Sequence, residues 1–446
     1  MTQPPHHLTF EKTLSLDGST FTLARLGRFL AVTRLQKVLQ EYPKISNLIL
    51  QQMDLCEPIL DLLAKLACDR AWKSWKVIDC QIPSSSTAPD YPALLYLEQP
   101  NVQIFVLQTT ATFASRRRQE ETVQFLPVGR LLHSKNTALK YLRLSFHELD
   151  DVAALGLSQG LEQTTSLVDL CLSGTRRCGR HIELLCRGLL RNQTLTSLGM
   201  ADCQFGDACI ADLVTALQGH ATLQSLDLSN NSCAERGLLS LREMIAQTPN
   251  LHTLDLKMQR ERLDLSLLAP ALHSNTSLKK LGLSNTSLQD DDVTCLVDAL
   301  LHNTTLQDLD LSDNRKVSDV ALLHLARHLP RLNLVTLNLR KLQNRGSKSV
   351  LQAMAEGMRD NDTLQLLRIH YWRHVQYTRQ ILFCANANRG GRRILRQQET
   401  VPLGVWPRVM ERAFRKQYFC PLAQEAGIDN IYYLLRNAPV LWEWRR

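Results

Sequence analysis

TLQSLDLSNNSC, residues 222–233, contains the pattern that decides the fold. Three leucines follow the order LxxLxL, and a run of Ser and Asn comes after them. Apolar and polar residues alternate in LDL, which predicts a short β-strand whose leucines point inward. The Ser and Asn residues predict a polar turn directly after the strand.

The same phrase recurs along the chain at a nearly constant step. Successive strong copies are 28, 28, 28, 28, 27, 28, 28 and 30 residues apart. Fainter copies start at Ile45, Trp75 and Val102, so the chain contains about twelve units. The nine strong copies start at Leu139, Leu167, Leu195, Leu223, Leu251, Leu278, Leu306, Leu334 and Leu364.

The second half of each unit has helical spacing. In DDVTCLVDALLHNTTL, residues 291–306, the apolar side chains of Val293, Leu296, Ala299 and Leu300 fall on one helix face. A strand, a turn and a helix within 28 residues cannot bury their own apolar surface. Stacked neighbours bury it, so we expect an α/β solenoid with an inner parallel sheet and outer helices.

The eighth residue after each strand start is informative. It is Cys203, Asn231, Asn314, Thr175 or Thr286 in five of the units. In a stacked coil this side chain points into the core beside backbone groups of the turn. An Asn side chain both donates and accepts hydrogen bonds, so it satisfies buried amides that lack a sheet partner. Cys and Thr are smaller substitutes.

The motif LxxLxLxx[NC], the period of about 28 residues and the helical second half resemble leucine-rich repeats of the ribonuclease-inhibitor type. The resemblance covers about residues 45 to 370 and implies a horseshoe with a parallel sheet inside and helices outside. Repeats of this type occur in ribonuclease inhibitors, in the sensing segments of NOD-like receptors and in the GTPase-activating protein for Ran. The resemblance implies a habit of protein binding without naming a partner.

Three regions follow from the pattern: an N-terminal cap at residues 1–44, the repeats at 45–372, and a basic helical module or cap at 373–446. A terminal repeat exposes an apolar edge, so a cap is physically required. We expect the N-terminal cap to contain a hairpin turning at Asp17–Gly18, followed by an amphipathic helix that stops before Pro43.

Residues 373–446 leave the repeat pattern and carry much of the charge. From Tyr371 onward there are 13 Arg or Lys against 5 Asp or Glu, within a net charge of +9 for the chain. We expect two or three helices, with starts near Pro402–Pro407 and Asp429. The region is similar to a C-terminal module without assigned activity on some other proteins of this repeat type. Its arginines at 389, 392, 393 and 396 are alternative sites for phosphate or an acidic partner.

Composition indicates an ordinary globular protein, with 44% hydrophobic and 21% charged residues. No run reaches the ~18 apolar residues of a membrane span, so we expect no membrane partner. The first residues lack a basic segment followed by an apolar one, so we expect no signal peptide and reduced cysteines. These points predict a cytoplasmic protein. The basic triplet at residues 116–118 leaves a nuclear location as the alternative.

The sequence contains no motif of a known catalytic site. GxxxxGK[ST], GxSxG and HExxH are all absent, so we predict a protein that is not an enzyme and has no cofactor. His324 and His328 are four residues apart, but two His residues make at most half of a zinc site, so no metal is assigned. Arg and aromatic residues interleave near Tyr371 without a nucleic-acid-binding motif behind them, so nucleic acid is not the expected partner.

The inner face is the remaining place for function. Strands about 4.8 Å apart would give nine strands an arc of roughly 40 Å, which suits an interface of ~800 Å² per partner. Asp227 and Asp255 should lie on adjacent strands. The turn after Leu256 departs from the usual Ser-x-Asn pattern and adds basic residues at one rim. The predicted contact residues are Tyr141, Arg143, Asp169, Asp227, Asp255, Lys257, Arg260, Arg262, Lys280, Asp308, Asp310 and Arg368.

These observations favour a non-enzymatic scaffold that binds a protein partner through the concave face. Two alternatives remain open. One is a GTPase-activating regulator resembling the Ran activator, although that family carries an acidic tail where this chain is basic. The other is an adaptor that recruits further machinery through residues 373–446. The identity of the partner and the oligomeric state do not follow from the sequence.

Overall fold

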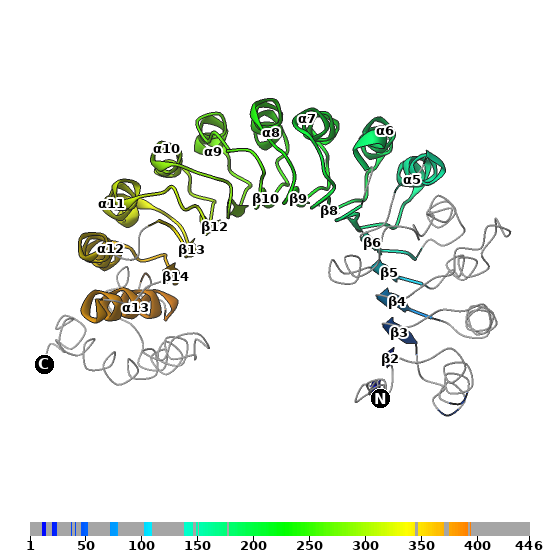
Figure 1. The fold of residues 1–446 in the computed structure, drawn as a ribbon, viewed down its shortest axis with the longest axis horizontal. Coiled ribbons are helices and arrows are strands. Elements are labelled where there is room, and N and C mark those ends of the chain that lie inside the picture. The colour runs from blue at the N-terminus through cyan, green and yellow to red at the C-terminus, as the bar shows by residue number, and fades with distance from the viewer. Residues whose placement is uncertain are drawn as a thin grey trace, which may run out of the picture. The chain divides into compact units, whose positions relative to one another are not determined.

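The chain divides into two compact units, Met1–Leu251 and His252–Arg446. In each unit the strands form the inner layer and the helices the outer layer (Figure 1). The computed structural model describes residues 11–14, 20–24, 37, 41, 46–51, 72–78, 102–108, 138–145, 149, 151–175, 178–343, 347–369, 374–390 and 393.

The first unit begins with a hairpin, as the sequence predicts. β1 (Glu11–Leu14) and β2 (Thr20–Ala24) pair in antiparallel fashion, with Leu14 opposite Phe21. β2 then pairs in parallel with the first repeat strand, so the hairpin extends the sheet. The predicted turn at Asp17–Gly18 lies outside the described residues, and so does most of the helix predicted before Pro43.

The repeats of the first unit supply seven further strands, each parallel to its neighbour. Both the strong LxxLxL copies and the fainter ones form strands, which confirms the predicted register. The strands are β3 (Asn47–Gln51), β4 (Ser74–Ile78), β5 (Ile104–Gln108), β6 (Tyr141–Ser145), β7 (Asp169–Cys171), β8 (Ser197–Gly199) and β9 (Ser225–Asp227). The helices are α5 (Asp151–Gln163), α6 (Ile182–Arg191), α7 (Asp207–Ala216) and α8 (Glu235–Gln247).

The second unit repeats the same arrangement with five parallel strands. They are β10 (Thr253–Asp255), β11 (Lys280–Gly282), β12 (Asp308–Asp310), β13 (Thr336–Leu339) and β14 (Leu366–Ile369). The helices are α9 (Ala269–Ser274), α10 (Asp290–Leu300), α11 (Asp319–His328), α12 (Lys348–Asp360) and α13 (Val375–Arg389). The architecture is an α/β solenoid.

The core lies between the strands and helices and is mostly leucine. The middle residue of each three-residue strand is buried, as with Leu226, Leu254 and Leu309. Its two neighbours are only partly covered in these strands, whereas in β11 Gly282 is buried as well. Burying one such leucine contributes about 2 kcal/mol. A strand this short buries its leucine only when neighbouring repeats pack against it. The free energy of burial therefore favours stacking of the repeats.

The buried Asn of the opening stretch ties neighbouring turns together, as predicted. Asn231 Nδ2 donates to the carbonyls of Met200 and Leu228 at 2.9 and 3.0 Å. Its Oδ1 accepts from the backbone N–H groups of Cys203 and Phe205 at 3.2 and 3.1 Å. One side chain therefore satisfies four backbone groups that the sheet leaves unpaired.

The residue before this position adopts the left-handed conformation in seven repeats. These residues are Gly174, Asp202, Asn230, Met258, Asn285, Asp313 and Lys341, with φ between 53° and 78°. Gly, Asn and Asp enter this region at low cost. Met258 and Lys341 carry ordinary side chains there, so their turns are strained.

A second Asn ladder runs along the helix ends. Asn303 Nδ2 donates to the carbonyl of Leu272 at 2.7 Å, and its Oδ1 accepts from Leu306 N at 2.8 Å. Asn192 and Asn361 make the corresponding bonds in their own repeats. The recurring "NxTL" and "NTSL" phrases thus mark an inter-repeat link as well as the end of a helix.

α13 packs as the next helix of the second unit, beyond the boundary expected at residue 372. Its Asn388 donates to the carbonyls of Leu364 and Asn361 at 2.9 and 3.1 Å, as the ladder residues do. Arg389 is partly buried and donates to the carbonyl of Gln365 at 3.0 Å. The helices expected near Pro402–Pro407 and Asp429 lie outside the described residues, so the role of residues 373–446 stays a prediction.

Candidate interaction surfaces

The outward-facing residues of the short strands, most of them polar, form two rows on the inner face of the second unit. One row is Thr253, Lys280, Asp308, Thr336 and Leu366 in successive strands. The other is Asp255, Gly282, Asp310, Asn338 and Arg368. Strand register therefore brings together the predicted contact residues Asp255, Lys280, Asp308, Asp310 and Arg368 on one face, which we call the strand face of the second unit.

Asp255 and Lys257 form an ion pair at one end of this strand face. Lys257 Nζ lies 2.8 Å from Asp255 Oδ2, and Lys257 N donates to Oδ1 at 3.1 Å. The pair leans over Gly282 of the next strand, where an added Cβ would lie 2.5 Å from Asp255 Oδ1 and 2.9 Å from Lys257 Cε. Gly282 thus leaves the space that the pair occupies.

Asp310 and Asp308 differ in how they are held. Asp310 Oδ1 accepts from Ser312 N at 3.0 Å and from Ser312 Oγ at 2.6 Å, so this carboxylate stabilises its own turn. Within the described part of the chain, Asp308 makes no side-chain ion pair. Asp308 is half-exposed and lies beside the exposed Lys280 on the neighbouring strand. Its carboxylate is the one most available to a ligand.

The turn after β10 lies at the rim of the strand face. Met258 is 48% exposed with φ of 55°, and Arg260 is exposed. Gln259 is buried at the position that Asn231 and Asn314 hold in other repeats. The departure from the Ser-x-Asn pattern therefore places a methionine on the surface, close in sequence to the exposed Arg260.

Arg262, also predicted as a rim contact, already has a partner. Its Nε and Nη2 donate to Asp292 Oδ2 and Oδ1 at 3.1 and 2.9 Å. Asp292 is 2% exposed and also accepts from Gln289 N and Leu265 N at 2.9 and 3.3 Å. The hydrogen bonds to Asp292 raise the pKa of Arg262. Arg262 fixes the turn to the start of α10, so its first role is structural.

The first unit has a strand face of its own. Tyr141 is 46% exposed and lies beside Asp169 in register, while Arg143 is exposed two residues further along β6. Asp227 Oδ1 accepts from Ser229 N and Oγ at 3.0 and 2.5 Å, which repeats the arrangement at Asp310. Asp227 and Asp255 belong to different units, so their expected adjacency stays a prediction.

Sequence reasoning missed Met258 at the rim and Gly282 on the strand face. The signal for Met258 was present, because the residue seven places after each repeat start is Gly, Asn or Asp in five of the seven turns and Met or Lys in two. Gly282 gave no signal, because its importance comes from side chains of the preceding repeat.

Comparison with known proteins supports the pattern found in the sequence. The family described as "Leucine Rich repeat" matches residues 191–208 and 302–326. The mouse protein "Ribonuclease inhibitor" is 27% identical over 173 residues, which cover 38% of this chain and 38% of that protein. These are leucine-rich repeats of the ribonuclease-inhibitor type.

The repeats are also similar to those of NOD-like receptors. Human "NACHT, LRR and PYD domains-containing protein 5" is 27% identical over 267 residues, covering 58% of this chain and 22% of that protein. Human "NACHT, LRR and PYD domains-containing protein 13" is 32% identical over 186 residues, covering 41% of this chain and 18% of that protein. This leucine-rich-repeat chain therefore matches about a fifth of the length of those receptors.

No helix among the described residues has both the length and the apolar character that crossing a bilayer requires.

Proposed function

We propose that this leucine-rich-repeat chain is a non-enzymatic scaffold that binds a protein partner. The proposed contact in the second unit is the strand face, with the turn after β10 as its rim. Short strands held by buried leucines and Asn ladders give a rigid surface, so little conformational entropy is lost when a partner binds. Similarity to NOD-like receptors and to a ribonuclease inhibitor supports a role in protein interaction.

The observation that carries the proposal is Met258. A left-handed Met costs about 1 kcal/mol relative to Gly or Asn at the same place, and this one exposes 48% of its surface. A strained residue is retained where its side chain has a use. Methionine fits irregular apolar surfaces and is enriched at protein interfaces, so Met258 is the proposed apolar anchor of the rim.

Charges on the strand face suggest the chemistry of the partner. Asp308 offers a carboxylate without an ion pair in the described residues, and the exposed Lys280 lies beside it on β11. Arg368 is exposed on the same face two strands further on, in β14. A partner that places a basic side chain at Asp308 and acidic side chains at Lys280 and Arg368 would complement this face. Such complementarity sets partner choice and association rate more than affinity.

The test compares two variants of the second unit. One reverses a charge in the strand layer, and the other reverses a charge in the helix layer. Asp308→Lys changes the strand face without removing a turn hydrogen bond, whereas Asp310 would lose its bonds to Ser312. Glu356→Lys is the matched control, because it makes the same charge change at an exposed position of α12. Both full-length variants are compared with the unchanged chain by crosslinking and quantitative mass spectrometry in cells that express it.

We expect Asp308→Lys to reduce the yield of directly crosslinked partners about tenfold, and Glu356→Lys to leave that yield within about twofold. Crosslinks should map to strand-face and rim residues. Equal yields for all three proteins, or the same loss in both variants, would contradict the proposed surface.

A further inference from the structure

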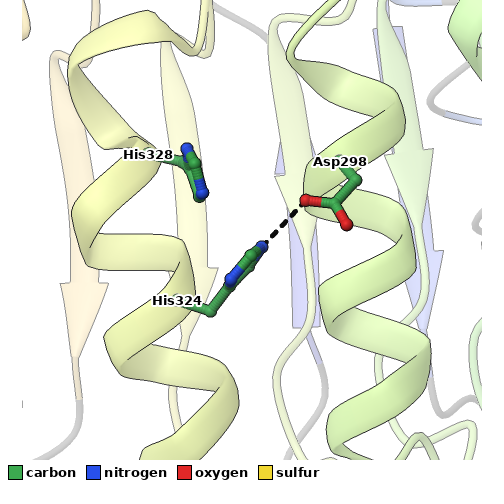
Figure 2. A group of neighbouring side chains, drawn as sticks. All are labelled: Asp298, His324 and His328. Carbon is green, nitrogen blue, oxygen red and sulfur yellow. Dashed lines mark hydrogen bonds and ion pairs between the residues drawn. The ribbon is translucent and has the colours of Figure 1, made fainter.

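A cluster of three potential metal ligands lies in the helix layer of the second unit, away from the strand face. Asp298 comes from α10, and His324 and His328 come from α11, four residues apart on one helix face. Figure 2 shows the three side chains meeting between the two helices. Among the residues that the structure describes, these three form the group of His, Cys, Asp or Glu side chains whose ligand atoms lie close enough together to hold one ion.

The distances between these atoms are near those of a metal site. His324 Nε2 lies 2.9 Å from Asp298 Oδ1, and the ring centroids of His324 and His328 are 4.6 Å apart. One ligand atom from each residue lies within 4.8 Å of the other two. Ligands at ~2.1 Å from a tetrahedral zinc ion are about 3.4 Å apart. Small side-chain rotations within both helices would therefore close the site.

We propose that Asp298, His324 and His328 bind one divalent transition-metal ion, with zinc as the best fit. Two imidazole nitrogens and one carboxylate are donors that zinc, nickel and copper prefer, whereas magnesium and calcium require a shell of oxygen atoms. Three protein ligands leave a fourth position, which water fills in a mononuclear site.

The surroundings allow an ion to enter. The side chain of Asp298 is 57% exposed and that of His324 is 27% exposed, so solvent reaches the cluster.

A bound ion would join two consecutive repeats. α10 belongs to the repeat that starts at Leu278, and α11 belongs to the one that starts at Leu306. The stability of a repeat protein is approximately the sum of its single repeats and the interfaces between neighbours. A ligand that binds only the folded chain stabilises it by mass action, so this ion would strengthen one defined interface in the helix layer.

A histidine pair elsewhere in the same unit provides the control. The rings of His273 and His302 are 4.4 Å apart, much like those of His324 and His328, and both residues are exposed. In the part of the chain that the structure describes, no carboxylate completes this second pair into a group of three. Both pairs thus contain two neighbouring histidines, and they differ in whether a carboxylate supplies a third ligand.

The test is titration of the full chain, stripped of metal with a chelator, with ZnCl2 in a calorimeter. We expect one zinc equivalent that is lost, or weakened about tenfold or more, in His324→Ala and in His328→Ala. The double variant His273→Ala/His302→Ala should retain this equivalent. Excess ZnCl2 should raise the Tm of the unchanged chain by several degrees, whereas MgCl2 should not.

Two further measurements test the proposal even if an alanine variant folds poorly. CuCl2 added to the unchanged chain should give an electron paramagnetic resonance spectrum with coupling to imidazole nitrogen, and Asp298→Asn should weaken zinc binding while keeping the helices intact. A zinc equivalent that survives in both His324→Ala and His328→Ala would overturn the proposal. So would its loss in the His273→Ala/His302→Ala control.

Discussion

The turns after β10 and β12 occupy the same place in two repeats of the second unit but are stabilised in different ways. After β12, Asn314 is fully buried, and its side chain bonds to the carbonyls of Leu283 and Leu311 and to the N–H groups of Thr286 and Leu288. After β10, Gln259 fills that place, and an ion pair between Arg262 and the buried Asp292 ties the turn to the next helix.

The comparison shows what a repeat needs and what it can change. Both turns need buried polar groups satisfied, because an unpaired buried donor or acceptor costs ~1–3 kcal/mol. An Asn within the turn does this after β12, where Asp313 holds the left-handed position and Arg315 is exposed next to Asn314. An Arg–Asp pair from outside does part of the same work, and the turn then carries Met258 and Arg260 on its surface. The difference on the surface is therefore Met258, which places an apolar side chain where the turn after β12 carries Asp313.

The largest effect is expected at the consensus turn. Asn314→Ala removes the hydrogen bonds of this amide to five backbone groups and should destabilise the second unit by about 3 kcal/mol. Urea unfolding combined with hydrogen exchange of residues 278–343 measures the loss. Arg315→Ala, at the exposed neighbouring position, should change stability by less than about 0.5 kcal/mol. Similar losses in both variants would mean that the Asn ladder does not hold the turn.

A smaller effect is expected at the divergent turn. Arg262→Met leaves Asp292 buried with only its backbone hydrogen bonds to Gln289 and Leu265. The expected loss is about 2 kcal/mol, below that of a fully buried pair because the Arg262 side chain is 41% exposed. Arg260→Met is the control and should be nearly neutral. Equal unfolding midpoints for the two variants would show that the ion pair does not replace the Asn.

The smallest effect has the opposite sign. Met258→Asn places a residue suited to the left-handed region where Asn230 and Asn285 already occur, and it should stabilise the chain by about 0.5–1 kcal/mol. The same variant should lower the yield of crosslinked partner, because the apolar anchor is lost. A variant that is more stable and binds as well as before would remove Met258 from the proposed surface.

Much of the fold could be predicted from the sequence because the repeat carries its own register. Each LxxLxL copy, including the faint ones at Ile45, Trp75 and Val102, contains a strand. The position of Asn231 predicted its role, since a residue that recurs at one place in a stacked coil has the same surroundings each time. The rows of outward residues on the strands were predictable for the same reason.

Side-chain pairs between neighbouring repeats could not be predicted from the repeat pattern. Arg262 meets Asp292 across 30 residues, and Asp298 meets His324 across 26, so neither separation equals the repeat length of about 28. Both contacts depend on where neighbouring helices start and on the direction of each side chain. Met258 was identifiable from its position, but only its backbone φ of 55° shows the strain.

The sequence by itself determined the solenoid of strands and helices, because a short unit that cannot bury its own leucines must stack. It also determined which side chains fill the core and which lie on the strands' open face. Only the tertiary structure decided which charged groups are already paired and which are available. The physical reason is that hydrophobic burial follows the period of one chain segment, whereas ion pairs and metal ligands depend on distances of a few ångströms between segments from different repeats.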